Sequence, residues 1–459
     1  MLKKAQLFSQ SGEYQKAVSI LQPSFTPQSD EIQTNLLAAC LIKLEEFQDC
    51  VDMLRRKDKA NGLTSTQLRL LASSLTQLSL CDEANLIFHR IPNIAENPRA
   101  SQDYALNLLR MGEPVQARKI LRIALEKFPG DSRLMLQEGL LGLKFGIDEV
   151  SRKNYFQRHL INKTEPLPAN LAPLWWDSEL SGKHILLWGE QGIGDELIFF
   201  LVLKILTQAN VTCSVACEAR LISLLSHNFP SLEIVIDRHD QKAIAELGRT
   251  AGFDFQARVG DLWQLVEINA NALPNGPLLE APDNHIEDHR ATFPADKSEK
   301  TIGIAWYSKD TRNNMPNVFL DRIYRQIPAN WLSLQHSIAD KSGLGNSLIR
   351  QKAATHESFT ANDDFCAYAA SILNTDMVIT NDTTAGVFAT LLGKTTLVLC
   401  PADPFWFWSA HQRLGNADFT TVLARRWNQS WDQFYGENVL PFLESNNTIS
   451  SSGNEAKGR

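Results

Sequence analysis

The stretch LWGEQGIGDELIFF, residues 187–200, joins an apolar run to a second apolar run through three glycines and an aspartate. Short β-rich runs such as HILLW (184–188) and VTCSVA (211–216) alternate with helical runs around it, which predicts a parallel sheet covered on both faces. The glycines follow a predicted strand and precede a predicted helix, where a ligand can approach the backbone. Ligands of open α/β sheets bind at the carboxyl ends of the strands, so we expect Asp195 to face a cleft. The alternative is an N-cap aspartate that satisfies free amides.

A second strand–helix series begins with TIGIAW (301–306), after a polar stretch at 281–300 that we interpret as a linker. It continues through DMVIT (376–380) and TTLVLC (395–400). Two α/β units in tandem imply a cleft between them.

The first third of the chain repeats with a period of 33 to 34 residues. Two series of small residues keep this spacing, twelve residues apart: Ala5, Ala38, Ala72, Ala105 and Gly139, then Ala17, Cys50, Ala84, Ala117 and Ser151. Helix–turn–helix units of this length, with small residues where paired helices touch, resemble the tetratricopeptide repeat; the alternative is an irregular helical bundle. About five such units predict a superhelix whose concave side binds a peptide or protein.

Composition bounds the function classes. A chain of 459 residues with 44% hydrophobic and 21% charged residues has room for two or three cores, and its formal charge of −7 argues against nucleic acid or anionic lipid as partner. The seven cysteines are scattered through apolar runs, which favours a reducing compartment. We read no targeting segment and no membrane span, and we expect a cytoplasmic protein.

The segment NDTTAG, residues 381–386, stands in the same strand-to-helix position of the second series. Hydroxyls and small residues at a helix start leave backbone N–H groups free for an anion such as a diphosphate; the alternative is an ordinary capped helix. The loop WYSKDTR, residues 306–312, carries Ser308, Lys309 and Arg312 at the same edge. Its two cations either neutralise phosphate charge or are solvated loop residues.

Other motifs exclude other chemistries. The glycines of residues 189–194 do not have the dinucleotide spacing G-x-G-x-x-G, which disfavours a nicotinamide enzyme. Gly393-Lys394-Thr395 lacks the first phosphate-loop glycine, because Phe388 occupies that position. The histidine pair His285 and His289 and the cysteine pair Cys213 and Cys217 lack the remaining ligands of metal motifs, and no D-x-D occurs. We therefore expect no metal and no cofactor beyond a co-substrate.

Several stretches together resemble bacterial proteins that join tetratricopeptide repeats to a glycosyltransferase domain of GT-B fold. They are LWWDSELSGKHILLWGEQGIGDELIFF, ACEARLISLLSHNFP, WLSLQ, DMVITNDTTAGVFATLLGKTTLVLCP and the tryptophans of DPFWFW. That domain is similar to heptosyltransferases and, more distantly, to O-linked N-acetylglucosamine transferase. The resemblance implies two Rossmann-like domains facing a cleft. With the repeats it gives an array at 1–165, an acceptor-side domain at 166–300, a nucleotide-sugar domain at 301–443 and a disordered tail at 444–459.

The resemblance also implies site roles. Asp195 is expected to be the base that activates the acceptor, on a loop that contributes Glu190, Gln191, Gly192 and Gly194 to the acceptor side. The donor diphosphate and nucleotide are expected at Ser308, Lys309, Arg312, Gln335, Asp382, Thr383, Thr384, Ala385 and Gly386, with Ser333 and Leu334 beside Gln335. The chain departs from the family at Val387, where heptosyltransferases usually carry a histidine, and at Ala367, where many relatives place an acidic residue.

We therefore expect a metal-independent, inverting glycosyltransferase that moves a sugar from a nucleotide-sugar to a hydroxyl of a protein acceptor, for which flagellin is a candidate. Transfer of a hexose, a heptose or a nonulosonic acid stays open. The alternatives are a binding or scaffold protein whose transferase domain has lost activity, and a lipopolysaccharide sugar transferase. Val387 and Ala367 favour the scaffold, whereas the intact G-I-G-D and N-D-T-T segments favour the enzyme.

Overall fold

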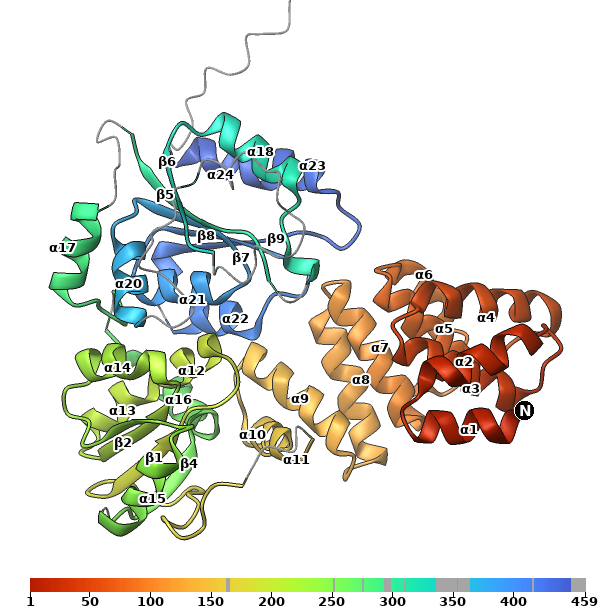
Figure 1. Ribbon diagram of the computed structural model, residues 1–459, viewed down its shortest axis with the longest axis horizontal. Helices are drawn as coiled ribbons and strands as arrows, with labels where there is room; N and C mark the ends of the chain where they lie inside the picture. The colour runs from red at the N-terminus through yellow and green to blue at the C-terminus, as the bar shows by residue number, and fades with distance from the viewer. Residues whose placement is uncertain are drawn as a thin grey trace, which may run out of the picture. The chain divides into compact units, whose positions relative to one another are not determined.

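The computed structural model describes residues 1–161, 166–250, 252–274, 276–292, 299–308, 311–335, 353, 364–414 and 417–446. The chain divides into two compact units: Met1–Leu141 with Lys153–Asn162, and Gly142–Arg152 with Lys163–Arg459. The first is all helical, and the second holds two parallel sheets, which confirms the predicted order of a helical array followed by α/β units (Figure 1).

Antiparallel helix pairs build the first unit. Side-chain caps begin several of these helices: Asp30 accepts the amide of Gln33, and Thr64 forms a capping box with Gln67. Among the described residues, no helix has the length and apolar character needed to cross a membrane. The helices are α1 (Leu2–Gln10), α2 (Tyr14–Leu21), α3 (Glu31–Lys43), α4 (Phe47–Asn61), α5 (Ser65–Gln77), α6 (Cys81–Phe88), α7 (Pro98–Arg110), α8 (Pro114–Lys127), α9 (Ser132–Phe145), α10 (Glu149–Tyr155) and α11 (Arg158–Ile161).

The predicted repeat is confirmed by the burial of its small residues. In both series the alanines are fully buried, as are Cys50 and Ser151. A Cβ on Gly139 of α9 would lie 2.3 Å from the backbone nitrogen of Tyr155 in α10, so only glycine fits there. The small residues therefore stand where paired helices touch, as the 33 to 34-residue phase predicts.

The first sheet has four parallel strands in the order β3-β2-β1-β4. This order reverses beside β1, because β1 is flanked by β2 on one side and by β4 on the other. The strands are β1 (His184–Trp188), β2 (Thr212–Cys217), β3 (Val235–Asp237) and β4 (Phe255–Arg258). Their helices are α12 (Ile193–Phe199), α13 (Val202–Gln208), α14 (Ile222–Asn228), α15 (Gln241–Thr250) and α16 (Trp263–Ile268).

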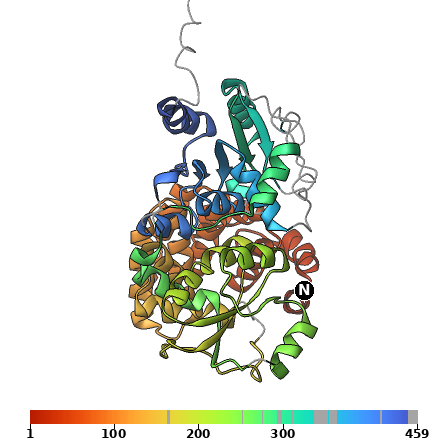
Figure 2. The same ribbon diagram turned by 90° about the vertical axis from the view of Figure 1, so that its left-hand side faces the viewer.

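The second sheet has five parallel strands in the order β6-β5-β7-β8-β9, with its reversal beside β5. The strands are β5 (Thr301–Ala305), β6 (Asn330–Ser333), β7 (Met377–Asn381), β8 (Thr396–Cys400) and β9 (Thr420–Ala424). Helices α18 (Asn317–Gln326), α23 (Trp431–Phe434) and α24 (Leu440–Ser445) cover one face, and α20 (Phe365–Leu373), α21 (Thr384–Leu391) and α22 (Trp406–Arg413) cover the other (Figures 1 and 2). Strands β5, β7 and β8 are buried along their whole length, which explains their continuous apolar runs.

The segment interpreted as a linker does connect the two sheets, and it contains a helix, α17 (Asp283–Thr292), that the sequence analysis did not predict. Its sequence is polar, but it packs on α20: His289 is 3% exposed, and Asn374 Nδ2 donates to the carbonyl of Ile286 at 2.9 Å. At the end of the chain, α24 extends to Ser445, past the start of the expected tail, and residues 447–459 lie outside the described residues.

The turn between α9 and α10 belongs to the α/β unit. Lys144 Nζ lies 2.6 Å from Asp403 Oδ1 and also donates to the carbonyl of Pro404. Arg413 donates to the carbonyl of Leu143 at 2.8 Å, and Glu267 accepts the amide of Ile147 at 2.6 Å. The fifth helix pair therefore supplies residues to both compact units.

Replacing Gly139 by alanine should lower the free energy of unfolding by about 1–3 kcal/mol, because the added methyl group meets the backbone of α10. In an open helix position the same change would stabilise by about 1 kcal/mol. Gly130→Ala, in the turn between α8 and α9, is the control for adding a methyl group without a clash, since nothing lies within 4 Å of its added Cβ. Urea unfolding followed by circular dichroism measures both. Equal midpoints for the two variants would contradict the close helix contact.

Candidate active site

The candidate site lies where the carboxyl ends of the two sheets' strands meet helices α12 and α21. Helix α12 follows β1, beside which the order of the first sheet reverses, and α21 follows β7, which pairs with β5 at the reversal of the second sheet. Open α/β sheets bind ligands at such positions. A Cβ on Gly194 of α12 would lie 3.2 Å from Oγ1 of Thr384 in α21. The structure thus brings together the two glycine-containing segments expected to form the site, one from each sheet (Figure 1).

Asp195 lies in the first turn of α12, whose N-cap, Gly192, offers no capping side chain. Burial raises the pKa of the Asp195 carboxyl to about 6; hydrogen bonds from the Gly192 amide and the Trp406 indole act against this rise, and the charge of Glu190 adds to it. A carboxylate with a pKa near neutrality accepts a proton more readily than an exposed aspartate. Burial thus gives Asp195 a pKa closer to neutrality than that of an exposed aspartate.

Trp406 reaches this carboxylate from the other sheet's side. Its ring stacks on Phe199 with centroids 5.5 Å apart and meets Trp263 edge to face at 5.1 Å. Phe199 and Trp263 are fully buried side chains that follow β1 and β4. The aromatic cluster docks the start of α22 against α12 and α16, and it fixes the side of the site on which Asp195 lies.

The expected acceptor-side loop separates into buried and exposed residues. Glu190 is 5% exposed and accepts the amide of Gly260 at 3.0 Å, so it joins the loops that follow β1 and β4. Gln191 is exposed with φ at 62°, and its carbonyl lies 3.4 Å from Arg238 Nη2. Gly194 is buried against Thr384. Of the expected loop residues, Gln191 and Gly192 face solvent.

A buried ion pair between Glu196 and Arg238 packs against the loop that follows β1. Glu196 is 0% exposed; it accepts the amide of Glu218 at 2.6 Å, and its Oε2 lies 2.9 Å from Arg238 Nη1. Burial raises the pKa of Glu196 to about 7, and the Arg238 guanidinium opposes this rise. A Cβ on Gly189 would lie 2.2 Å from Glu196 Oε1, so this glycine leaves room for the carboxylate.

On the donor side, α21 begins at Thr384 without a side-chain cap. The hydroxyl of its N-cap, Thr383, instead lies 3.1 Å from that of Thr380 and donates to the carbonyl of Asn381 at 3.3 Å. Thr383 and Thr384 are partly exposed, and Ala385 is buried behind them. An uncapped helix start of this kind offers backbone amides to an anion.

Asp382 and Gly386 fix the position of the next helix, α22. Asp382 Oδ2 accepts the amide of Phe405 at 2.8 Å, and Oδ1 accepts the indole N–H of Trp408 at 2.7 Å. A Cβ on Gly386 would lie 3.1 Å from the Trp408 ring, so its lack of a side chain permits this packing. Both Asp382 oxygens have protein partners, which gives this residue a positioning role.

The loop after β5 is tied to its neighbours by amide side chains. Gln335 Oε1 accepts the amides of Trp306 and Tyr307 at 3.0 and 2.9 Å, and Asn314 accepts the amide of Ser308 at 2.6 Å. Ser333 and Leu334 lead into Gln335 from the end of β6. Arg312 lies on this loop, partly exposed, and Lys309 lies outside the described residues.

Sequence reasoning missed Arg238, Glu196 and Trp406. Arg238 directly follows β3, so its place at the carboxyl end of a strand was the available signal. Glu196 stands inside an apolar run and had no signal of its own, because its partners are 22 and 42 residues away. Trp406 entered the sequence analysis only as one of the tryptophans of DPFWFW, which gives no indication of its contacts with Phe199 and Trp263.

A cavity of about 470 Å³ lies in another part of the α/β unit. It is lined by residues that precede β1, including Trp175 and Asp177, and by residues of α13 and α16. None of the expected site residues lines it, so we do not place the reaction there.

Comparison with known proteins gives limited similarity. No protein-family model matches the chain. Protein FlbA of Caulobacter vibrioides is 30% identical over 148 residues, which cover 29% of this chain and 24% of FlbA, so the chain spans about a quarter of that curated relative's length. The solved structure of a glycosyl transferase family 9 protein from Veillonella parvula is 14% identical and covers 61% of this chain and 93% of its own, with a TM-score of 0.42. A structure of MamA is 16% identical and covers 35% of this chain and 94% of its own, with a TM-score of 0.29.

Removing Arg238 should destabilise the protein strongly, because it leaves the Glu196 carboxylate buried without its cation. We expect Arg238→Ala to lower the free energy of unfolding by about 3 kcal/mol. The control is Arg249→Ala, which removes a 69% exposed arginine from an exposed pair with Glu246 and should cost less than about 1 kcal/mol. Denaturant titration of both variants measures the difference, and a loss no larger than that of the control would show that the buried pair contributes little.

Proposed function

We propose that the chain is a glycosyltransferase that moves a sugar from a nucleotide-sugar to an acceptor hydroxyl. The observation that carries the proposal is the meeting of a raised-pKa carboxylate, Asp195, with the uncapped start of α21, joined by the contact between Gly194 and Thr384. Sugar transfer needs a base for the acceptor and charge stabilisation for the departing diphosphate. Each sheet supplies one of these functions.

In the proposed reaction, Asp195 takes the proton of the acceptor hydroxyl as the oxygen attacks the anomeric carbon. The new carbon–oxygen bond forms on the face opposite the leaving group, so the configuration inverts. The bond from the anomeric carbon to the phosphate oxygen breaks, and its electron pair leaves with the nucleoside diphosphate. The Trp406 indole lies on the same side of the site, against Phe199 and Trp263, and it opposes the rise in the pKa of Asp195.

The leaving diphosphate is assigned to the first turn of α21. The amides and hydroxyls at Thr383 and Thr384 face the anion, and the helix dipole adds partial positive charge. Arg312, and Lys309 outside the described residues, are the cations of the loop after β5. In this proposal they perform the role that a divalent ion held by a D-x-D motif has in other transferases, and the sequence contains no such motif.

The acceptor is proposed to be a protein bound by the helical array, with flagellin as the candidate that the resemblance implies. Helical repeats present continuous surfaces for peptides and proteins, and binding there raises the effective concentration of the acceptor at the base. A lipopolysaccharide acceptor is the alternative, and it leaves the array without a role. A thermal-shift screen of nucleotide-sugars identifies the donor, and mass spectrometry of lysate proteins glycosylated with that donor identifies the acceptor.

Thr384→Glu should weaken nucleotide binding at least about 10-fold, because it places a negative charge where the diphosphate is proposed to bind. The matched control is Val318→Glu, which adds the same charge to the first turn of α18, where Val318 is 72% exposed. Isothermal titration with the nucleoside diphosphate identified in the screen measures both. Unchanged affinity in Thr384→Glu would place the donor elsewhere.

Asp195→Asn should lower turnover by about 10²–10⁴ while donor binding is kept, as expected for loss of a positioned base. In the unsubstituted protein, kcat/KM should fall as the pH drops below about 6, because protonation of the Asp195 carboxyl removes the base. Asp240→Asn, an exposed helix-capping change in the same half of the unit, is the control.

The same measurements separate the proposed enzyme from the scaffold alternative. Turnover that is unaffected by Asp195→Asn would remove this residue from the mechanism. Tight donor binding without turnover in the unsubstituted protein, with every acceptor that the array captures, would favour a binding protein whose transferase domain is inactive.

A further inference from the structure

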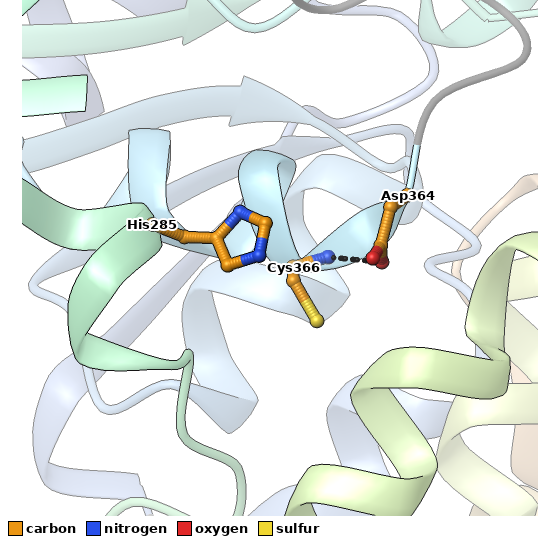
Figure 3. A group of neighbouring side chains, drawn as sticks. All are labelled: His285, Asp364 and Cys366. Carbon is orange, nitrogen blue, oxygen red and sulfur yellow. Dashed lines mark hydrogen bonds between the residues drawn. The ribbon is translucent and has the colours of Figure 1, made fainter. Parts of the chain in front are cut away.

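Three side chains from two helices converge at the edge of the second sheet, away from Asp195. His285 lies on α17, Asp364 is the N-cap of α20, and Cys366 lies in the first turn of α20 (Figure 3). One ligand atom from each, a ring nitrogen, a carboxylate oxygen and the sulfur, lies within 4.8 Å of the other two. In the sequence, the metal-ligand type of side chain nearest to His285 that forms a motif with it is His289. Asp364 and Cys366 lie far along the chain, and the packing of α17 on α20 brings them beside His285.

The three groups are available to a ligand. Asp364 Oδ1 accepts the amide of Cys366 at 2.9 Å, which leaves the second carboxylate oxygen for another partner. Cys366 is 1% exposed, and its sulfur lies within 4.8 Å of the ligand atoms of His285 and Asp364. The His285 ring takes part in none of the hydrogen bonds found among the described residues and is half-buried.

We propose that His285, Asp364 and Cys366 bind one zinc ion, with water as the fourth ligand. Imidazole, carboxylate and thiolate are the three side-chain ligands of zinc, and the thiolate disfavours magnesium and calcium. A tetrahedral zinc ion places its ligand atoms about 3.5 Å apart, so small side-chain rotations close the site. On binding, the metal replaces the thiol proton, which is released to solvent. This site departs from the expectation, based on sequence motifs alone, that the chain holds no metal.

The zinc ion would join the segment that connects the two sheets to the second sheet. Helix α17 lies in this connecting segment, in which the amides of Leu278 and Leu279 also donate to the carbonyl of Leu391. The first turn of α20 lies beside the end of β6, because the Tyr368 hydroxyl donates to the carbonyl of Leu334 at 3.0 Å. The proposed role is structural: the metal holds α17 against α20 and takes no part in sugar transfer.

The test uses the full chain after removal of metals with a chelator, and it needs no transferase activity. Zinc is titrated in competition with a chromophoric chelator, and cobalt is added separately as a spectroscopic probe of thiolate ligation. We expect one zinc ion per chain, a thiolate-to-cobalt charge-transfer band, proton release on binding, and a higher unfolding temperature with zinc than without it.

Three variants each remove one ligand: Cys366→Ala, His285→Ala and Asp364→Asn. The asparagine still caps α20, so Asp364→Asn separates the ligand role from the capping role. Each should weaken zinc binding at least about 100-fold, and Cys366→Ala should also abolish the cobalt band. Cys213→Ala, at a buried cysteine, and His227→Ala, at an exposed histidine, are the controls and should bind as the unsubstituted chain does.

Two results would overturn the proposal. One is the absence of zinc binding tighter than about 10 μM. The other is binding that persists unchanged in the three ligand variants, which would assign the metal to another part of the surface. If Cys366→Ala fails to fold, the half-buried His285 and Asp364 positions still decide between these outcomes.

Discussion

The position of the Trp406 indole is the constraint on which the candidate site depends. The ring belongs to the second sheet's half, but it packs on Phe199 and Trp263 of the first, and its indole opposes the rise in the pKa of Asp195. Aromatic contacts of this kind add about 0.5–1.5 kcal/mol each beyond the area they bury. The indole therefore holds the two halves together at the point where the carboxylate is placed.

A second carboxylate fixes the tryptophan in turn. Asp382 accepts hydrogen bonds from the Phe405 amide and the Trp408 indole, on either side of Trp406 in the sequence. Hydrogen bonds to a charged acceptor are about twice as strong as those between neutral groups. Asp382 therefore sets the start of α22, the helix that carries Trp406.

Features that depend on local pattern were predictable from the sequence. The repeat phase indicated the helix pairs because small residues recur where helices cross, and the apolar runs indicated β5, β7 and β8 because these strands are buried throughout. Helix α17 escaped prediction because its polar composition resembles that of a linker. The partners of Glu196, Asp382 and Gln335 also escaped prediction, since each lies more than 20 residues from its partner and the pairing exists only in the folded chain.

The division of the fifth helix pair has a consequence for how such a chain can change over generations. A solenoid needs its terminal repeat closed off from solvent, and here residues 142–152 belong to the α/β unit through Lys144, Arg413 and Glu267. Duplication, loss or exchange of repeats upstream of this pair should leave the contacts of Lys144, Arg413 and Glu267 in place. The last pair, in contrast, shares residues with the α/β unit and should change only together with the sheets. Diversity in what the array recognises is therefore expected to accumulate toward the N-terminus, with the final pair kept as a fixed adaptor.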